Sequence, residues 1–222
     1  MYNKEQIAKT IDHAALKPFF TDQGIIENAR NCARWQVASF CVRPTDVPLA
    51  VKELQGSGVP AAAVVGFPYG SNRPEVKTME AKLAIEDGAE ELDMVMNVGK
   101  FLSGDYEFVQ RDIEAVVAEA KKENILVKVI LEICYLSEEQ IAKACKIAEA
   151  AGADFVKTST GFGDGPATPE AIDIMMKTVG RTMGVKAAGG VRSYETAVAY
   201  LEQGCKRLGA SSTQAILDGA SE

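Results

Sequence analysis

The sequence predicts an α/β protein whose parallel strands close into a single (β/α)8 barrel, that is, a TIM barrel. Three observations indicate this fold: short apolar runs recur along the 222 residues, segments with helical spacing separate them, and no Pro/Gly/Ser-rich linker divides the chain. Strand and helix alternating eight times indicate a parallel sheet, and closure of the eight units is the most economical arrangement. An open doubly wound sheet is the alternative, but it favours a G-x-G-x-x-G turn after the first run, which this chain lacks. We therefore expect residues 1–222 to form one barrel domain.

Eight runs of mostly apolar residues are the expected strands. Runs of this length, bounded by turn residues, are typical of strands that are buried in a parallel sheet. The first run is the weakest of the eight. In chain order the runs are residues 11–14, 37–42, 61–67, 91–96, 126–132, 154–158, 184–188 and 206–210.

The segments between the runs are the expected helices. In residues 107–117 the apolar side chains recur with helical spacing and share one face, namely Val109, Ile113, Val116 and Val117. Hydroxyl residues after several runs are expected to begin helices as N-caps, and they are Thr21, Ser137, Thr168 and Ser193. Glycines stand before several runs, where a helix end needs a residue that tolerates positive φ, and they are Gly58, Gly88, Gly152, Gly184 and Gly204.

Composition and charge exclude several classes of protein. The formal net charge of −7 argues against a binder of duplex nucleic acid, which needs a clustered basic face. The single histidine excludes a zinc site that uses two or three histidines. The five cysteines contain no C-x-x-C pair and are expected to be free thiols in a reducing cytosol. The N-terminus has no apolar signal core and no apolar run approaches 18 residues, so we expect a cytoplasmic protein with no membrane contact.

Ionisable residues interrupt four of the runs, although strands covered on both faces should be almost continuously apolar. Asp93, Lys128, Lys157 and Lys186 stand in four successive runs. Because side chains alternate along a strand, Lys128 should face the lumen together with Ile130 and Glu132. Its neighbours Val127, Val129 and Leu131 should then face the helices. Lys157 and Lys186 likewise face away from the side of their apolar neighbours Val156 and Val185.

A buried ammonium is costly, so these lysines must be paired, shifted in pKa or placed at a wet strand end. One interpretation is that they pair with Asp93 or Glu132 and only specify the packing of the barrel. The other is chemical: neighbouring ammonium groups lower the pKa of a lysine toward neutrality, and a neutral amine is what Schiff-base formation requires. Three inward lysines with an aspartate on successive strands favour covalent chemistry on a carbonyl group.

Two further segments indicate a phosphate site. Residues 188–193 and 209–212 each follow a strand and open a helix, with glycines and serines at the junction. Bare backbone amides, hydroxyl groups and helix N-termini bind phosphate, and in (β/α)8 enzymes the loops after strands 7 and 8 commonly do so. The glycine-rich segment 161–165 is expected to lie over the same group or to act as a lid.

At this point the sequence resembles the deoxyribose-phosphate aldolases, a family of class I aldolases that form a Schiff base. The matching motifs span nearly the whole chain in the order and spacing of that family, and they are residues 11–18, 40–44, 91–97, 128–132, 156–162 and 186–192. The chain departs from the family at Ala14, at Ala187-Ala188, at Phe162, where some members carry a phosphate-binding lysine, and at the C-terminus, which has no tyrosine.

The resemblance implies roles for individual residues. Lys157 would form the Schiff base, Lys186 would lower its pKa and take part in proton transfer, and Asp93 would relay protons through water. Lys128 would complete the polar network, and Asp12 and Cys41 would line the pocket. The remaining substrate-binding residues would be Thr160, Gly161, Gly189, Gly190, Gly209, Ser211 and Ser212, most of them around the phosphate.

The implied reaction is reversible cleavage of 2-deoxy-D-ribose 5-phosphate to D-glyceraldehyde 3-phosphate and acetaldehyde, in deoxynucleoside catabolism. No step requires a metal or another cofactor. The implied partners are the phosphosugar and further copies of the chain, as a homodimer or homotetramer. Three alternatives stay open at this stage: a lysine-dependent aldolase with another substrate, a non-catalytic sensor of phosphorylated sugars, and a metal-dependent aldolase.

Overall fold

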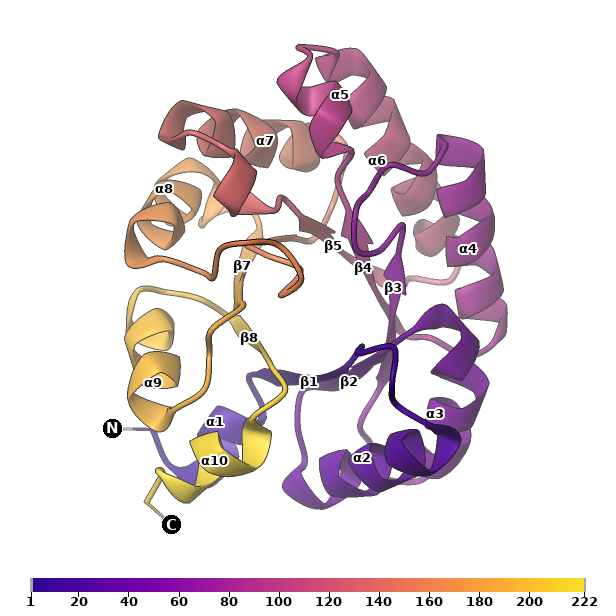
Figure 1. Cartoon of the computed structure of the whole chain (residues 1–222), viewed down its shortest axis with the longest axis vertical. Coiled ribbons are helices and arrows are strands. Elements are labelled where there is room, and N and C mark those ends of the chain that lie inside the picture. Colours follow the sequence, from indigo (N-terminus) through magenta and orange to yellow (C-terminus); the bar gives the residue numbers. More distant parts are fainter. Residues whose placement is uncertain (1, 222) are drawn as a thin grey trace.

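A computed structural model describes residues 2–221, and in these residues eight parallel strands form a closed barrel. Each strand pairs with the next along the chain, and β8 closes the ring by pairing with β1. Figure 1 shows the strands around the centre and the helices outside them. The (β/α)8 barrel predicted from the sequence is confirmed. The strands are β1 (Ile11–Ala15), β2 (Ser39–Val42), β3 (Ala61–Val65), β4 (Glu91–Val95), β5 (Leu126–Ile130), β6 (Phe155–Lys157), β7 (Gly184–Ala188) and β8 (Arg207–Ala210).

Helices follow every strand and cover the outside of the barrel. The α-helices are α1 (Lys4–Ala8), α2 (Asp22–Trp35), α3 (Val47–Leu54), α4 (Pro74–Glu86), α5 (Val98–Leu102), α6 (Tyr106–Lys121), α7 (Glu138–Ala150), α8 (Pro169–Val179), α9 (Tyr194–Glu202) and α10 (Thr213–Asp218). Two short 3-10 helices are η1 (Pro44–Asp46) and η2 (Ile133–Tyr135). Two of the α-helices are additions to the expected strand–helix units: α1 precedes the first strand, and α5 lies between β4 and α6.

The helix starts follow the chemistry that the sequence indicates. The expected hydroxyl residues are all N-caps that accept a hydrogen bond from a backbone N–H in the first turn, namely Thr21, Ser137, Thr168 and Ser193. Such a cap satisfies a backbone donor that has no partner inside the helix and contributes about 1 kcal/mol. Each cap therefore fixes where the chain turns from a strand-end loop into a helix.

The glycines before the strands serve two different purposes. Four of them have positive φ, as predicted, and they are Gly58, Gly88, Gly152 and Gly204. The prediction for Gly184 is wrong: this residue begins β7, and its φ is not positive. A Cβ added at Gly184 would lie 2.1 Å from Cε1 of Phe155, its neighbour on β6. Gly184 therefore makes room for an aromatic ring instead of ending a helix.

The strand alternation predicted from the sequence is confirmed for residues 127–130 of β5. On β5, Val127 and Val129 belong to the apolar core between the strands and the helices, whereas the side chains of Lys128 and Ile130 do not. The predicted apolar face of α6 is buried in the same core. A second, smaller apolar cluster lies inside the barrel near β1, β2 and β3 and consists of Leu16, Cys41, Ala62 and Val64. The lumen is thus apolar on one side and charged on the other.

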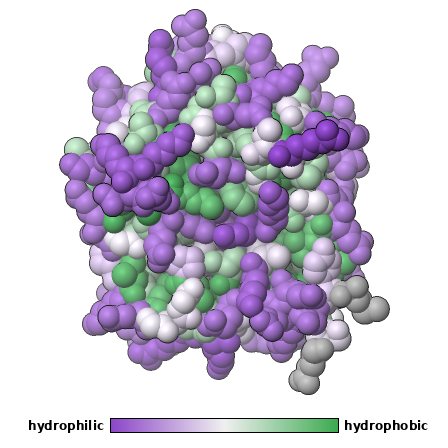
Figure 2. Space-filling model, turned by 180° about the vertical axis from the view of Figure 1, so that it is seen from behind, coloured by the Kyte–Doolittle hydropathy of each residue, from purple (hydrophilic) through white to green (hydrophobic). Residues whose placement is uncertain are grey.

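One face of the molecule is mainly hydrophilic. Figure 2 shows the face opposite to that in Figure 1, where hydrophobic side chains form scattered patches between hydrophilic ones. Among residues 2–221 no helix combines the length and the apolar character needed to cross a membrane.

Candidate active site

Four successive strands bring three lysines and an aspartate together inside the barrel. The strand register sets Asp93 of β4 beside Lys128 of β5, and Lys157 of β6 beside Lys186 of β7. All four side chains are buried, with exposed fractions between 0% and 4%. The cluster predicted from the charged residues in the apolar runs is therefore present in the fold.

Asp93 is the centre of this cluster. Its Oδ1 accepts a hydrogen bond from Nζ of Lys128 at 2.8 Å, and its Oδ2 accepts from Nζ of Lys157 and of Lys186, both at 2.7 Å. Burial raises the pKa of Asp93, but the three ammonium groups outweigh burial and hold this pKa well below the ordinary range. The carboxyl group is therefore ionised, and its two oxygens accept hydrogen bonds from all three lysines.

A second layer of charges lies deeper in the barrel. Asp12 of β1 accepts from Nζ of Lys186 at 2.5 Å and from Nη1 of Arg207 at 2.5 Å. Glu91, at the start of β4, accepts from Nζ of Lys128 at 2.6 Å and from Nη2 of Arg207 at 2.8 Å. Burial raises the pKa of Asp12, but Lys186, Lys128 and Arg207 outweigh it and lower that pKa. Asp12 and Glu91 thus tie Lys186, Lys128 and Arg207 together below Asp93.

The three lumen lysines differ in the number of carboxylates with which they form ion pairs. Burial lowers the pKa of Lys128 and of Lys186, but two or more carboxylates outweigh burial, so both pKa values are raised. Among residues 2–221, Lys157 forms an ion pair with one carboxylate, that of Asp93. Burial, assisted by the charge of Lys186 and opposed by Asp93, lowers the pKa of Lys157. Of the three lumen lysines, Lys157 is therefore the one whose amine most readily becomes neutral.

The charge balance of the lumen agrees with this assignment. Four cations share three carboxylates, and the seven side chains are Lys128, Lys157, Lys186 and Arg207 with Asp12, Glu91 and Asp93. One cation is thus in excess when every group is ionised. Loss of one proton from Lys157 makes the cluster electrically neutral, and a neutral cluster is less costly to bury.

A cavity of about 400 Å³ opens above the lysines at the carboxyl ends of the strands. Its volume lies in the range that holds a small organic molecule. Lys157 lines it, whereas Lys128 and Lys186 are not among its lining residues. The walls come from the loops after β1, β6, β7 and β8. A molecule in this cavity can therefore reach the amine of Lys157.

Glycine and hydroxyl residues form one wall of the cavity, as the resemblance implies. The residues of the predicted substrate site that line it are Thr160, Gly161, Gly189, Gly190, Gly209 and Ser211. Gly189 and Gly190 have positive φ, and a Cβ on Gly190 would lie 2.9 Å from Cβ of Pro166. The backbone therefore turns here in a way that leaves amide groups free of side chains, which suits an anion.

Other predicted substrate residues lie away from the cavity surface. Asp12 and Lys128 are fully buried beneath it, and Ser212 caps α10 outside the lining residues. Cys41 belongs to the small apolar cluster in the lumen. Burial raises the pKa of the Cys41 thiol to about 11, so this thiol is protonated and a poor nucleophile. The structure thus brings Asp12, Lys128 and Cys41 near the lysines but not to the wall of the cavity.

Glu132 does not pair with the lumen lysines, although the sequence allowed it as a partner. Strand β5 ends at Ile130, and Glu132 has a φ of 54°, so the alternation that would direct it inward has already stopped. Its carboxylate accepts hydrogen bonds from the backbone N–H of Thr160, at 3.1 Å, and from the Thr160 hydroxyl. Glu132 therefore holds the loop after β6 in place.

Sequence reasoning also missed Glu91 and Arg207 as parts of the site. Arg207 is the first residue of β8 and lies beside Lys186 in the register. The sequence did carry a signal for them, because charged residues are unusual at the start of strands that are buried in a parallel barrel. Their pairing across the lumen follows only once the ring is closed.

His13 lies outside this site. Its Nδ1 pairs with the hydroxyl of Thr213 and its Nε2 with Oδ1 of Asn28, both at 2.8 Å. Burial lowers the pKa of His13, so the imidazole is neutral and serves packing.

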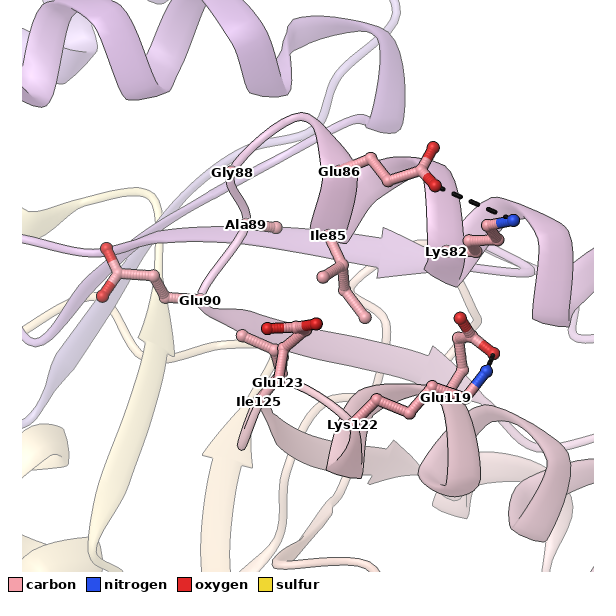
Figure 3. A pocket seen from close by; sticks show the side chains of 10 residues that line it. All are labelled: Lys82, Ile85, Glu86, Gly88, Ala89, Glu90, Glu119, Lys122, Glu123 and Ile125. Atoms are coloured by element: carbon pink, nitrogen blue, oxygen red, sulfur yellow. Dashed lines mark hydrogen bonds and ion pairs between the residues drawn. The ribbon is translucent and has the colours of Figure 1, made fainter.

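A second hollow of about 420 Å³ lies at the other end of β4 and β5 (Figure 3). It is lined by the ends of α4 and α6, where Glu86 faces Lys82 and Glu119 faces Lys122. Both lysines shown there are paired, Lys82 with Glu86 and Lys122 with Glu119, and the lumen lysines do not line this hollow. The chemistry of this molecule therefore belongs to the carboxyl-terminal end of the barrel.

Comparison with known proteins assigns the chain to a class of enzymes. The family model of the DeoC/LacD family aldolases matches residues 7–219. The chain belongs to this family of aldolases.

Similar proteins define the assignment further. The deoxyribose-phosphate aldolase of Clostridium perfringens is 52% identical over 98% of this chain and 96% of its own length. That of Thermococcus gammatolerans is 51% identical over 96% of both chains. The solved structure of the Aeropyrum pernix deoxyribose phosphate aldolase, described as tetrameric, has a TM-score of 0.91 and 32% identity, and the match covers 97% of this chain and 91% of that one. The resemblance to deoxyribose-phosphate aldolases noted in the sequence is confirmed.

Proposed function

We propose that this protein is a class I deoxyribose-phosphate aldolase. It reversibly cleaves 2-deoxy-D-ribose 5-phosphate to D-glyceraldehyde 3-phosphate and acetaldehyde, in deoxynucleoside catabolism. The observation that carries the proposal is the position of Lys157: it is the lumen lysine that lines the cavity, and burial lowers its pKa. A neutral amine that faces a substrate-sized cavity is the group that Schiff-base chemistry needs.

The first half of the reaction forms the covalent intermediate. The neutral amine of Lys157 attacks the C1 aldehyde of the open-chain sugar and gives a carbinolamine. Asp93 accepts the proton that the amine loses, since its Oδ2 lies 2.7 Å from Nζ of Lys157. Lys186 shares that same oxygen at 2.7 Å and donates a proton to the departing hydroxyl, which leaves as water. The product of these steps is an iminium ion on Lys157.

The second half breaks the carbon–carbon bond. A base removes the proton of the C3 hydroxyl, the C2–C3 bond breaks, and its electron pair moves onto the iminium nitrogen. Glyceraldehyde 3-phosphate leaves, and an enamine of acetaldehyde stays on Lys157. Protonation of the enamine carbon and addition of water then release acetaldehyde and the free amine. Asp93, which contacts Nζ of Lys157, carries these protons through water, together with Lys186, which contacts the same oxygen of Asp93.

The loops at the cavity wall hold the phosphate. Gly161, Gly189, Gly190 and Ser211 line the cavity beside Lys157, and Gly209 lies at the end of β8. Thr160 lines the same cavity, and Ser212 follows Ser211 at the start of α10. Binding the phosphate at this distance from the amine fixes the sugar so that C1 reaches Lys157. Asp12, Lys128 and Cys41 act from beneath the cavity, without metal or cofactor.

Borohydride reduction in the presence of acetaldehyde tests the proposal. An aldolase of this type gives an ethyl group on Lys157, found by peptide mass spectrometry, and the Lys157→Arg variant serves as the control because it keeps the charge and lacks the reactive amine position. Absence of the adduct would support the sensor of phosphorylated sugars and overturn the proposal. Adduct formation without release of acetaldehyde from 2-deoxyribose 5-phosphate would assign a different substrate. Loss of activity in chelator would indicate a metal-dependent aldolase.

Location and assembly complete the proposal. We infer that the protein works in the cytoplasm, which its five free cysteines support, because thiols persist in a reducing compartment. We further infer a homodimer or homotetramer, supported by the tetramer described for the Aeropyrum pernix relative. Light scattering coupled to size-exclusion chromatography measures this assembly, and a monomeric mass would contradict it.

A further inference from the structure

The mouth of the cavity carries a lysine that the reaction described above does not use. Lys17, in the loop after β1, lines the cavity together with Phe162 of the loop after β6. Its Nζ lies 4.0 Å from the centre of the Phe162 ring. Phe162 in turn packs edge-on against Phe67, with ring centres 5.2 Å apart. The ammonium of Lys17 therefore rests on an aromatic face at the entrance to the site.

The backbone of Lys17 is held from below by charged side chains. Arg43, directly after β2, donates hydrogen bonds to the carbonyl oxygens of Lys17 and Pro18, both at 3.3 Å, and of Phe20 at 3.0 Å. Asp46, which is buried, accepts from Nε of Arg43 at 2.5 Å and fixes the guanidinium. Arg43 thus determines where the loop after β1 runs, and the Lys17 side chain is the part left free to move.

The aromatic partner of Lys17 is held in a comparable way. The buried carboxylate of Glu132 accepts from the backbone N–H and from the hydroxyl of Thr160. That hydroxyl oxygen accepts from the backbone N–H of Phe162 at 3.0 Å. The buried acid Glu132, which follows β5, therefore positions Phe162 through Thr160, just as Arg43 positions Lys17. The hydrogen bonds in the loops after β1 and β6 therefore place Lys17 over the ring of Phe162.

The charges around the cavity leave Lys17 without an anionic partner. No residue that lines the cavity is acidic, and its cationic residues are Lys17, Lys157 and Arg192. Within residues 2–221 no carboxylate lies within ion-pair distance of Lys17. A cation over an aromatic ring at an exposed position is held only weakly, whereas a hydrogen bond from an ammonium to a phosphate is strong. An anion that enters the cavity can therefore draw Lys17 away from Phe162.

We propose that Lys17 is a specificity-determining residue, which leaves the Phe162 ring and binds the substrate phosphate at the mouth of the cavity, alongside the glycine loops. This inference rests on the proposed function and adds to it the selection of phosphorylated over unphosphorylated sugars. The backbone of the glycine and serine loops holds the phosphate through neutral donors, and Lys17 adds a mobile positive charge. Lys157 cannot supply this charge, because it reacts with the aldehyde. Phe162 keeps the lysine at the mouth while the site is empty.

The test compares two substrates that differ only in the phosphate. In Lys17→Met we expect KM for 2-deoxyribose 5-phosphate to rise about tenfold, with kcat nearly unchanged, because the lost contact is made equally before and during the reaction. KM for unphosphorylated 2-deoxyribose should stay at the wild-type value. Lys17→Arg should recover most of the affinity. Lys52→Met, which removes an exposed lysine of α3 outside the cavity, is the matched control and should behave as wild type.

A binding measurement separates this inference from the proposed function. Titration with inorganic phosphate, followed by phosphorus NMR, should show weaker binding to Lys17→Met than to wild type and to Lys52→Met. This holds even if the protein acts on another phosphorylated sugar. Equal phosphate affinity in Lys17→Met and wild type overturns the inference, as does an equal rise of KM for both sugars. Absence of cleavage of 2-deoxyribose 5-phosphate by wild type, with phosphate binding still dependent on Lys17, would overturn the proposed function alone.

Discussion

Buried lysines lie in two regions of this molecule, and their surroundings differ in one respect. Outside the barrel, Lys77 of α4 donates to Oδ2 of Asp112 on α6 at 2.6 Å and to the carbonyl oxygen of Val95 at 2.9 Å. Both side chains of this outer pair, Lys77 and Asp112, are 0% exposed. Inside the barrel, the three lysines and Arg207 share three carboxylates. The outer pair is balanced, and the lumen has one cation too many.

This difference separates a structural use of buried charge from a chemical one. In the outer pair, burial lowers the pKa of Lys77 and raises that of Asp112, and each charge opposes the shift of the other. Removing or neutralising one member of the pair would leave the other as a buried charge without a counter-ion. The pair therefore fixes α4 and α6 against the end of β4. In the lumen one amine can lose its proton, and each of the three carboxylates still has a cationic partner. The excess cation thus makes a reactive neutral amine compatible with a buried site.

The largest expected effect is the loss of chemistry in Lys157→Met, which removes the excess cation and the reactive amine together. We expect kcat/KM for 2-deoxyribose 5-phosphate to fall by roughly 10⁴-fold or more, because covalent catalysis is lost. The free energy of unfolding should stay the same or rise, since an apolar chain replaces a buried ammonium that exceeds its counter-charges. Acetaldehyde release and urea denaturation measure the two quantities. A large loss of stability would show that Lys157 is structural, as Lys77 is.

The next largest effect is expected in the outer pair. Asp112→Ala leaves the ammonium of Lys77 buried without its counter-ion, so we expect a loss of about 3–5 kcal/mol in the free energy of unfolding. Activity per folded molecule should change little, because the outer pair does not touch the cavity. Urea denaturation with kinetics on the folded protein checks both.

The double variant Lys77→Met/Asp112→Leu is the control for the outer pair. It removes both charges and keeps apolar volume between α4 and α6, so its loss should be much smaller than that of Asp112→Ala. Equal losses in the two proteins would mean that packing, and not a stranded charge, explains the cost.

Much of the fold and the centre of the site could be predicted because both depend on local patterns. Period-two alternation placed Lys128 and Ile130 on one face of β5 and Val127 and Val129 on the other, and charged residues in apolar runs marked the lumen. Glu132 escaped this reasoning because alternation holds only while the strand continues, and β5 ends at Ile130.

Contacts between distant segments could not be predicted. Glu91 meets Arg207 across the lumen only because the ring closes, and Lys17 meets Phe162 only because two loops take particular paths. Lys77 and Asp112 occupy helix positions where polar residues are usually exposed, so no pattern marks them as a buried pair. The sequence therefore predicts on which face of a strand or helix a residue lies, and the structure shows which distant residue it contacts.

The smallest expected effect, and the one that compares the two regions most directly, is a pH dependence of stability. The pKa of Lys157 is lowered in the folded protein, whereas in the unfolded chain it is the ordinary value of about 10.4. Between these two values the unfolded chain binds one proton more than the folded protein does. The free energy of unfolding therefore rises with pH in this window, by at most about 1.4 kcal/mol per pH unit from Lys157 alone. Lys186 contributes with the opposite sign and at higher pH, since its folded pKa is raised.

Subtracting two proteins isolates the contribution of Lys157. Lys77, whose pKa is also lowered, contributes equally to wild type and to Lys157→Met and cancels in their difference. We expect the stability of wild type relative to Lys157→Met to increase as the pH is raised from the lowered pKa of Lys157 toward the ordinary lysine value of about 10.4, measured by urea denaturation at each pH. A difference that stays constant would mean that Lys157 keeps its proton in the folded state. The excess cation of the lumen would then be a permanent charge. In that case the lumen would not provide a neutral amine, and it would not differ from the outer pair in its chemistry.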